Sequence, residues 1–534
     1  MSAWWGELDK DGCMSSRAVA KFLKVTRDKK APGGVRSRLL YCLRKGAGTG
    51  LWCLHASIFA PNDPNRSLVE ELVLGKKAFG SVAEERAFGV MYGMLLGDAI
   101  GARVEFMPVD YNYHEITGMG VGRAGNFDLL PGQWTDDSSM GLCLADSLLA
   151  THGSFDGHDC MHRFLAWWDF GYDNAFRFDK PKHSVGLGGN ISMSLSEYVY
   201  HPREETAAGD KRTSGNGSVM RNAAVPVCFH DDHDAGLTIA RRQSLVTHQG
   251  EEAAECCRLI THVAILAMNS TGSDEHRVRS VLSSLGETFQ TPVPSVKALA
   301  MSQMEDENPD RDWRWKTEEG AAYHYCESRA KKQPGYVGSY AMDATAMALH
   351  CVWSTHSFTE AVLKAVNMCG DADSVGAVTG QLAGAFYGFH AIPLEWIKTV
   401  SQWDGYETGL RAYRLFHKIW WNVSELEGPS SSASCSEKKE AEGVKKEVGS
   451  AQEVEKEDGA KKAASGDECE KEKKEEHEDS EAVEEKKDEE KKEEKEEEEE
   501  IFDEDDDYDA TIEFPVKKNP YAGRTIAQDE CNIQ

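Results

Sequence analysis

Through the middle of the chain, apolar side chains recur about every three to four positions, which is the spacing that gives an α-helix one apolar face. The clearest stretches are EERAFGVMYGMLLGDAI (84–100), MGLCLADSLLA (140–150), EEAAECCRLITHVAILAMN (251–269) and DATAMALHCVW (343–353). The strict alternation of a half-buried strand is hard to find in this region. The pattern therefore predicts an all-α domain in which many helices pack into one compact body.

The helical pattern fails at both ends, which divides the chain into three parts. Residues 1–83 hold two short basic stretches, SSRAVAKFLKV and VRSRLLYCLRKG, among turns that contain glycine and proline. Residues 426–534 are a low-complexity Glu/Lys segment with few large apolar side chains to offset the entropy of folding. We predict a small, partly helical N-terminal extension over 1–83, the helical domain over 84–425, and a mostly disordered acidic tail over 426–534.

The net charge of −30 comes mostly from that tail. The whole chain has 90 acidic and 60 basic residues, and residues 430–513 alone hold 36 of the acidic and 15 of the basic ones. The remaining positions carry 54 acidic and 45 basic residues, a net charge of −9, so the folded part is only mildly acidic. We expect the tail either to keep the chain in solution or to bind a basic protein partner.

Composition excludes several classes of protein. No apolar run approaches the roughly 20 residues of a membrane-spanning helix, and the first residues hold no apolar signal core. The 14 cysteines include no C-x-x-C pair, which argues against a disulfide framework and a thiolate zinc site. The negative charge disfavours nucleic acid as an obligate partner. We expect an intracellular protein of the cytoplasm or the nucleus, with no membrane partner.

Two acidic clusters, in WTDDSSM and CGDADSVG, each stand just before an apolar helical stretch. Their oxygen-bearing side chains are Thr135, Asp136, Asp137, Asp371, Asp373 and Ser374. Either cluster alone is typical of a helix N-terminus, where an acid caps the first turn. Together they offer four carboxylates and two hydroxyls, hard donors that suit Mg²⁺ or Mn²⁺. The pair of clusters therefore favours a binuclear metal site, with ions about 3.5–4 Å apart.

Three further features point to ligand chemistry. The loop TSGNGSVMRNAAVPV has glycines that allow backbone N–H groups to surround a phosphate, although in isolation a plain turn is the better explanation of such a motif. Glu105, seven residues after Asp98 in LLGDAIGARVEF, is either a surface acid or a proton carrier beside the metals. Thr247 and His248 follow a helical stretch and are typical of a helix end with a hydrogen-bonded histidine.

The ordered set GMLLGDAIGARVEF, WTDDSSM, GNGSVMR, TH and CGDADSVGAVTGQLAGAFYG resembles the ADP-ribosylglycohydrolase family over roughly residues 84–420. That family includes the dinitrogenase-reductase-activating glycohydrolases and the ADP-ribosylarginine and ADP-ribosylserine hydrolases. The resemblance implies an all-α fold with a magnesium pair in a cleft. It also implies hydrolysis of the bond between ribose C1″ and an acceptor on a protein or a small molecule.

The resemblance assigns roles to residues of this chain. The six oxygen-bearing side chains of the two acidic clusters become the metal ligands, and Glu105 becomes the catalytic residue, at a position that in some members gates the site or handles the proton. Ser138 and Ser374 stand where threonine is usual, and Leu187 stands where many members have an aspartate. The residues assigned to ADP-ribose are Gly189, Asn190, Gly215, Asn216, Gly217, Ser218, Met220, Arg221, His248, Gly338, Ser339 and Tyr340.

We therefore expect a magnesium-dependent hydrolase that releases ADP-ribose from modified protein side chains, with two Mg²⁺ or Mn²⁺ ions as cofactors. Two alternatives stay open on the sequence. The first is the same chemistry on poly(ADP-ribose), O-acyl-ADP-ribose or another small molecule that contains ADP-ribose. The second is a non-catalytic ADP-ribose-binding protein on the same fold.

Overall fold

The prediction of an all-α fold is confirmed for the part of the chain that the structure describes. The computed structural model describes residues 63–109, 116–176, 183–305, 311–320 and 337–421. Within these ranges three isolated bridges pair single residues, and no strand forms. Most of the predicted N-terminal extension and the whole acidic tail lie outside the described residues, so the predictions made for them stay predictions.

The helices have the following bounds, with η for 3₁₀ turns: α4 Arg66–Val73, α5 Val82–Gly101, α6 Asp136–Ala150, α7 Gly157–Phe170, α8 Gly189–Tyr200, η2 Asn216–Ser218, α9 Ala224–Cys228, α10 His233–Leu245, α11 Glu251–Asn269, α12 Asp274–Ser283, α13 Leu285–Thr288, α14 Pro294–Met301, α17 Ala341–Ser354, α18 Phe358–Val366, α19 Ala372–Tyr387, η4 Phe389–Ala391, α20 Leu394–Asp404 and α21 Glu407–Phe416. The four stretches named from the sequence lie in α5, α6, α11 and α17. None of these helices is long and apolar enough to cross a membrane.

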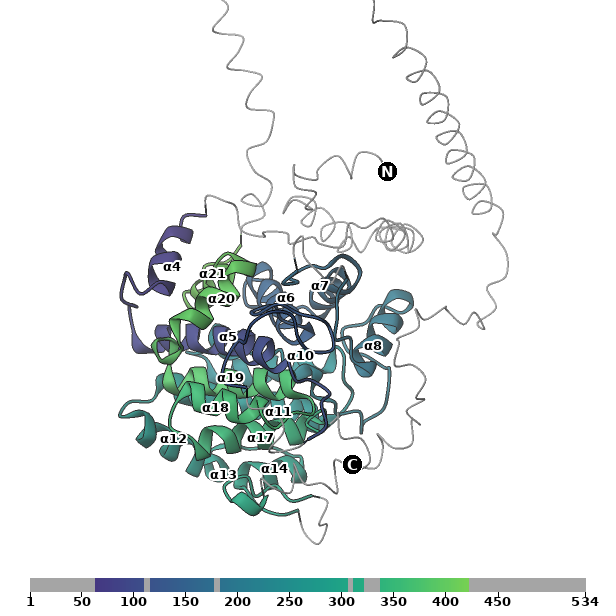
Figure 1. Cartoon of the computed structure of the whole chain (residues 1–534). Coiled ribbons are helices and arrows are strands. Elements are labelled where there is room, and N and C mark those ends of the chain that lie inside the picture. Colours follow the sequence, from purple (N-terminus) through teal and green to yellow (C-terminus); the bar gives the residue numbers. More distant parts are fainter. Residues whose placement is uncertain (1–62, 110–115, 177–182, 306–310, 321–336, 422–534) are drawn as a thin grey trace, which may run out of the picture. The chain divides into compact units, whose positions relative to one another are not determined.

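Helices α5 and α19 lie side by side in the middle of the fold, with the other helices around them (Figure 1). A Cβ added to Gly97 would lie 1.9 Å from the carbonyl oxygen of Gly376, and one added to Gly93 would lie 2.0 Å from that of Gly380. The two backbones touch because both helices carry glycine at every fourth position along this contact. Gly101 meets Ala372 in the same way, so the end of α5 lies beside the start of α19.

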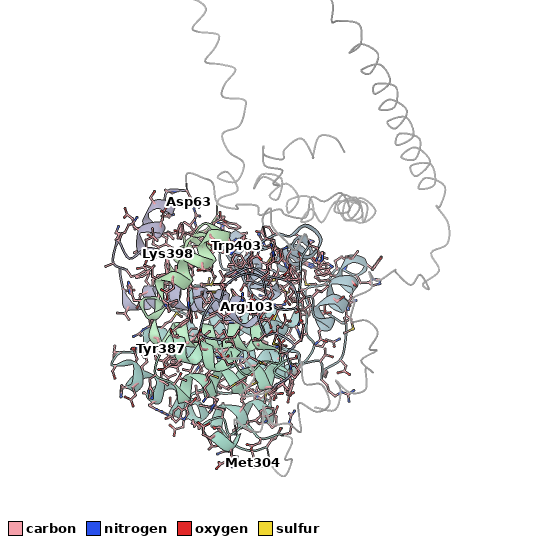
Figure 2. The ribbon with its side chains drawn as sticks, viewed as in Figure 1. Asp63, Arg103, Met304, Tyr387, Lys398 and Trp403 are labelled. Carbon is pink, nitrogen blue, oxygen red and sulfur yellow. The ribbon has the colours of Figure 1, made fainter. Side chains whose placement is uncertain are left out.

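The compact body also includes α4, which precedes the predicted start of the helical domain at residue 84. Val69 and Leu72 of α4 are buried in the main core. Just before α4, Asp63 accepts a hydrogen bond from Arg414 of α21, and Figure 2 shows Asp63 beside the α4 ribbon. The described body therefore begins at residue 63 or earlier.

Candidate functional site

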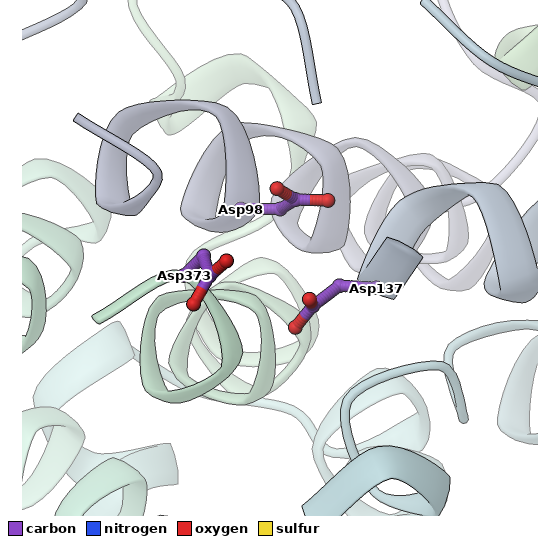
Figure 3. A group of neighbouring side chains, drawn as sticks. All are labelled: Asp98, Asp137 and Asp373. Carbon is purple, nitrogen blue, oxygen red and sulfur yellow. The ribbon is translucent and has the colours of Figure 1, made fainter. Parts of the chain in front are cut away.

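Three carboxylates from three different helices point toward one another at the centre of the fold. They are Asp98 near the end of α5, Asp137 in the first turn of α6 and Asp373 in the first turn of α19 (Figure 3). One oxygen of each lies within 4.8 Å of one oxygen of the other two, and all three side chains are buried. The glycine contact between α5 and α19 is what lets two of these aspartates come so close.

The hydroxyl of Thr135 lies among these three carboxylates. Thr135 is the N-cap residue of α6 and has an extended backbone. Its Oγ1 is 2.9 Å from Oδ1 of Asp98, 3.2 Å from Oδ2 of Asp137 and 3.3 Å from Oδ2 of Asp373. The two acidic clusters, 236 residues apart in the sequence from Thr135 to Asp371, therefore form one site.

The remaining predicted ligands lie around this group. Asn216 donates from Nδ2 to Oδ2 of Asp371 at 2.9 Å and to the carbonyl of Gly338 at 3.0 Å. The hydroxyl of Ser374 lies 3.6 Å from the sulfur of Met220. A Cβ on Gly186 would lie 1.9 Å from Oδ1 of Asp136, so the loop that precedes α8 passes directly over that carboxylate.

Burial makes ionisation of these acids costly. It raises the pKa of each of four carboxyl groups well above the ordinary range, and neighbouring carboxylates raise it further; the four are Glu105, Asp136, Asp137 and Asp373. Burial also raises the pKa of Asp98, but only to about 6, because hydrogen bonds from Ser138 and Thr135 favour its ionised form. The cluster is therefore a buried site of like charges that repel one another.

Nothing basic within the described residues forms an ion pair with any of these acids or with Asp371. Oδ1 of Asp137 and Oε2 of Glu105 are buried and have no hydrogen-bond partner. Buried charges without a partner are costly, and oxygen donors of this kind are the preferred ligands of hard divalent cations. The side chains present thus fit hard divalent cations.

Glu105 is held at the edge of the cluster by backbone contacts. The N–H of Phe106 donates to the carbonyl of Gly370 at 2.7 Å, and the N–H of Gly370 donates to the carbonyl of Met107 at 2.9 Å. Phe106 has a φ of 60°, which is rare for a bulky residue and shows that the chain turns sharply after Glu105. The side chain of Glu105 is 4% exposed, and it lies close enough to Asp373 and Asp371 for their charges to raise its pKa.

Several residues predicted to bind ADP-ribose also meet beside the acids. A Cβ on Gly215 would lie 2.8 Å from Nδ2 of Asn190 and 3.5 Å from Nε2 of His248, and Gly215 forms an isolated bridge with Tyr340. The N–H of Asn216 donates to the carbonyl of Ser339 at 2.9 Å. The fold therefore brings together loops that are far apart in the sequence.

His248 is a neutral residue in this site. Its Nδ1 is 2.8 Å from Oγ1 of Thr247, and burial together with the charge of Arg221 lowers the pKa of His248 to about 3. A neutral imidazole can offer one donor and one acceptor, but no charge.

Other residues predicted to contact ADP-ribose instead make hydrogen bonds and packing contacts inside the protein, next to the loop 215–218. Arg221 is completely buried, and it donates from Nε to Gln243 at 3.0 Å and from Nη2 to Thr247 Oγ1 at 2.7 Å. Ser218 accepts a hydrogen bond from Ser244 at 2.8 Å, and Met220 is buried against α19. Their assignment as direct ADP-ribose contacts stays a prediction, as does that of the exposed Gly189.

Asp98 is the functional residue that the sequence reasoning missed, since it used Asp98 only to locate Glu105. The available signal was its setting in the Gly-Asp-Ala-x-Gly run near the end of a helix without polar neighbours. A carboxylate buried at such a place must find donors, because an unpaired buried charge is too costly to keep.

Comparison with known proteins settles the family. The family model described as ADP-ribosylglycohydrolase matches residues 80–422. This chain belongs to the ADP-ribosylglycohydrolase family. The predicted resemblance and the predicted enzyme class, hydrolysis of a glycosidic bond, are thereby confirmed.

Three relatives illustrate the match. The chain is 32% identical over 322 residues to the ADP-ribosylarginine hydrolase Tri1 of Pseudomonas putida (strain GB-1), covering 60% of this chain and 75% of that one. It is 27% identical over 330 residues to the ADP-ribosyl-[dinitrogen reductase] glycohydrolase of Rhodospirillum rubrum, covering 60% and 92%. It is 24% identical over 360 residues to the ADP-ribosylhydrolase ARH3 of Mus musculus, covering 63% and 92%.

Proposed function

We propose that this ADP-ribosylglycohydrolase depends on two magnesium ions and releases ADP-ribose from modified protein side chains. The observation that carries the proposal is the group of buried carboxylates that no basic side chain of the described residues neutralises. The names of the relatives support the protein substrate, because they include an ADP-ribosylarginine hydrolase and a glycohydrolase of ADP-ribosyl-dinitrogen reductase.

The two acidic clusters, with Glu105 at their edge, would hold the ions. The chemistry that bound Mg²⁺ supplies is to neutralise the acids and to polarise oxygen atoms of the substrate near the bond that breaks. The ligand set consists of the side chains predicted from the sequence, namely Thr135, Asp136, Asp137, Asp371, Asp373 and Ser374.

The protein's own groups would bind and orient the substrate. The backbone N–H groups of Gly217 and Ser218 would bind the diphosphate, since the N–H of Asn216 already donates to the carbonyl of Ser339. The side chain of Asn216 donates a hydrogen bond to Asp371, so it would hold the diphosphate site at a fixed position beside the acidic cluster. Neutral His248 beside Gly215 would accept or donate one hydrogen bond without adding charge.

Glu105 would handle the proton. Burial and the charges of Asp373 and Asp371 raise the pKa of Glu105, which favours the protonated form of its carboxyl group. A group of that kind can protonate the acceptor atom as the bond to C1″ breaks. Leu187 cannot take this part, since its side chain has no acidic hydrogen, and it packs against the core.

The test is release of ADP-ribose by the full chain in magnesium, on arginine-linked, serine-linked and polymeric substrates side by side. Asp136→Ala and Asp373→Ala should abolish release from whichever substrate the wild-type chain cleaves. Asp234→Ala is the matched control, because Asp234 is a fully exposed acid on α10. Full activity in either site variant, or no release from any substrate by the wild-type chain, would contradict the proposal.

A further inference from the structure

Asp98 differs from the other acids of the cluster because both of its oxygens already accept hydrogen bonds. Oδ1 accepts from the N–H of Thr135 at 3.0 Å and from its hydroxyl at 2.9 Å. Oδ2 accepts from the N–H of Ser138 at 2.9 Å, and the Thr135 N–H is also within 3.2 Å of it. Asp137 and Glu105, by contrast, each keep one buried oxygen with no partner.

The donors around Asp98 are those that a helix cap normally serves. Thr135 is the N-cap residue of α6, and Ser138 is its third helical residue. An N-cap side chain usually accepts the N–H of the second or third helical residue, but the side chain of Thr135 makes no such bond. Asp98 supplies that acceptor from α5, so the hydroxyl of Thr135 is released from capping.

The contact with Asp98 also sets the direction of the Thr135 hydroxyl. A hydroxyl has one hydrogen to donate and two lone pairs with which to accept. The nearest acceptor of that hydrogen is Oδ1 of Asp98, at 2.9 Å, while the oxygens of Asp137 and Asp373 lie at 3.2 and 3.3 Å. With its hydrogen on Asp98, the hydroxyl turns its lone pairs to the side where Asp137 and Asp373 lie.

We propose that Asp98 is a positioning residue for the metal site and not itself a ligand. It caps α6 from outside that helix and takes the hydrogen of the Thr135 hydroxyl, so that the oxygen of Thr135 can coordinate a cation beside Asp137 and Asp373. The inference rests on the proposed metal-dependent function, and it assigns to Asp98 a part that the six predicted ligands do not play.

The first test uses the full chain in chelator, where no cation is bound. Asp98→Leu has a similar size but no acceptor atom, so the cap on Ser138 is lost, whereas the amide oxygen of Asp98→Asn could still accept from the Ser138 N–H. Hydrogen exchange at the Ser138 amide should become faster in Asp98→Leu than in the wild-type chain. Unchanged exchange in chelator would mean that Asp98 does not cap α6, and would overturn the proposal.

The second test measures the affinity for Mn²⁺ by titration followed by electron paramagnetic resonance. Asp98→Asn should weaken binding about 10- to 100-fold, the usual cost of losing a group that orients a ligand. In a Thr135→Ala background the same change should alter the affinity by less than about threefold, because the hydroxyl through which Asp98 acts is gone. An equal loss in both backgrounds would identify Asp98 as a direct ligand and overturn the proposal.

A third comparison does not depend on the folding of Asp98 variants. Thr135→Ser keeps the hydroxyl and should keep Mn²⁺ affinity within about threefold of the wild-type value, while Thr135→Ala loses it. Equal losses in Thr135→Ser and Thr135→Ala would overturn the proposal. A wild-type chain that binds Mn²⁺ but releases no ADP-ribose would contradict the proposed function instead, and the exchange and titration results would still decide the part of Asp98.

Discussion

Helix α6 carries a buried aspartate near each end, and within the described residues only one of the two is paired with a basic side chain. Asp137, in the first turn, lies among other acids and makes no ion pair within the described residues. Asp146, near the other end, accepts from Nε of Arg411 at 2.7 Å, and Nη2 of Arg411 reaches Asp173 at 2.7 Å. Both aspartates are 1% exposed or less, so burial does not distinguish them.

The difference distinguishes buried acids that a basic side chain of the protein neutralises from buried acids that need a bound cation or a proton. Burial opposes the charge of Arg411, but Asp146 and Asp173 outweigh it and hold the pKa of Arg411 above its ordinary value. A second guanidinium, that of Arg163, lies in the same network. At the start of α6 no basic side chain of the described residues pairs with the acids, so within that part of the chain neutralisation must come from protons or bound cations.

The largest expected effect comes from breaking the paired region. Arg411→Met leaves Asp146 and Asp173 buried without their partner, and should lower the free energy of unfolding by about 3–5 kcal/mol. Denaturant unfolding in chelator measures the change. The matched control is Lys418→Met, because Lys418 forms an exposed pair with Asp231 at 2.7 Å and should cost no more than about 1 kcal/mol. Equal losses in the two variants would show that the buried network is not needed for stability.

The unpaired region should respond in the opposite sense. Asp137→Asn removes one of several like charges, so in chelator its free energy of unfolding should equal or exceed that of the wild-type chain. Its kcat/KM for ADP-ribose release should fall about 10²- to 10³-fold, the usual cost of losing one organised electrostatic contact in a catalytic site. A loss of stability in chelator comparable to that of Arg411→Met would contradict the distinction between the two ends of α6.

Much of the helical fold could be predicted from residue spacing alone. The stretch 251–269 was predicted with the bounds that α11 has, since its apolar positions repeat cleanly and Glu251 and Glu252 suit a first turn. The two acidic clusters at the starts of α6 and α19 could be predicted as well, because runs of acids before helices are local features, while their part as metal ligands stays a prediction. The local sequence pattern was sufficient to predict a feature wherever all of its residues lie in one segment.

The paired network and the position of Asp98 could not be predicted, because both depend on contacts between distant segments. Arg411 and Asp146 are 265 positions apart, and neither segment has a sequence feature that predicts contact with the other. Asp98 lies 37 positions before Thr135, and its approach to α19 depends on the glycine contact of two helices. Only the packed structure shows which buried acids have a basic partner.

A third, smaller effect separates the two regions by cation binding. Saturation of the wild-type chain with Mg²⁺ at 100 times its dissociation constant should raise the free energy of unfolding by about 2.7 kcal/mol. Arg411→Met should keep this increase in the free energy of unfolding, because the substituted residue contacts the other end of α6. Asp137→Asn should lose most of the increase. Thermal unfolding with and without chelator measures all three proteins. An increment retained in Asp137→Asn would place the cation away from this cluster.

The smallest effect is a dependence of stability on pH that bound cation should remove. Burial raises the pKa of Asp98 to about 6, and it raises the pKa of Asp137 well above the ordinary range. Between pH 4 and 6 the native state in chelator therefore holds protons that the unfolded chain has already lost. Its free energy of unfolding should fall as pH rises, by about 1.4 kcal/mol per pH unit for each proton held in excess.

The acids of the paired network titrate as well, so the informative quantity is the difference between two curves for one protein. Groups outside the cluster contribute equally with and without Mg²⁺ and cancel in that difference. Because cations compete with protons for the cluster, the gain from Mg²⁺ should grow from pH 4 to pH 6, as the chelated protein loses stability and the loaded protein does not. A gain independent of pH over this window would mean that cation binding displaces no protons from the cluster that contains Asp98 and Asp137. These acids would then need a cation no more than the acids that Arg411 pairs.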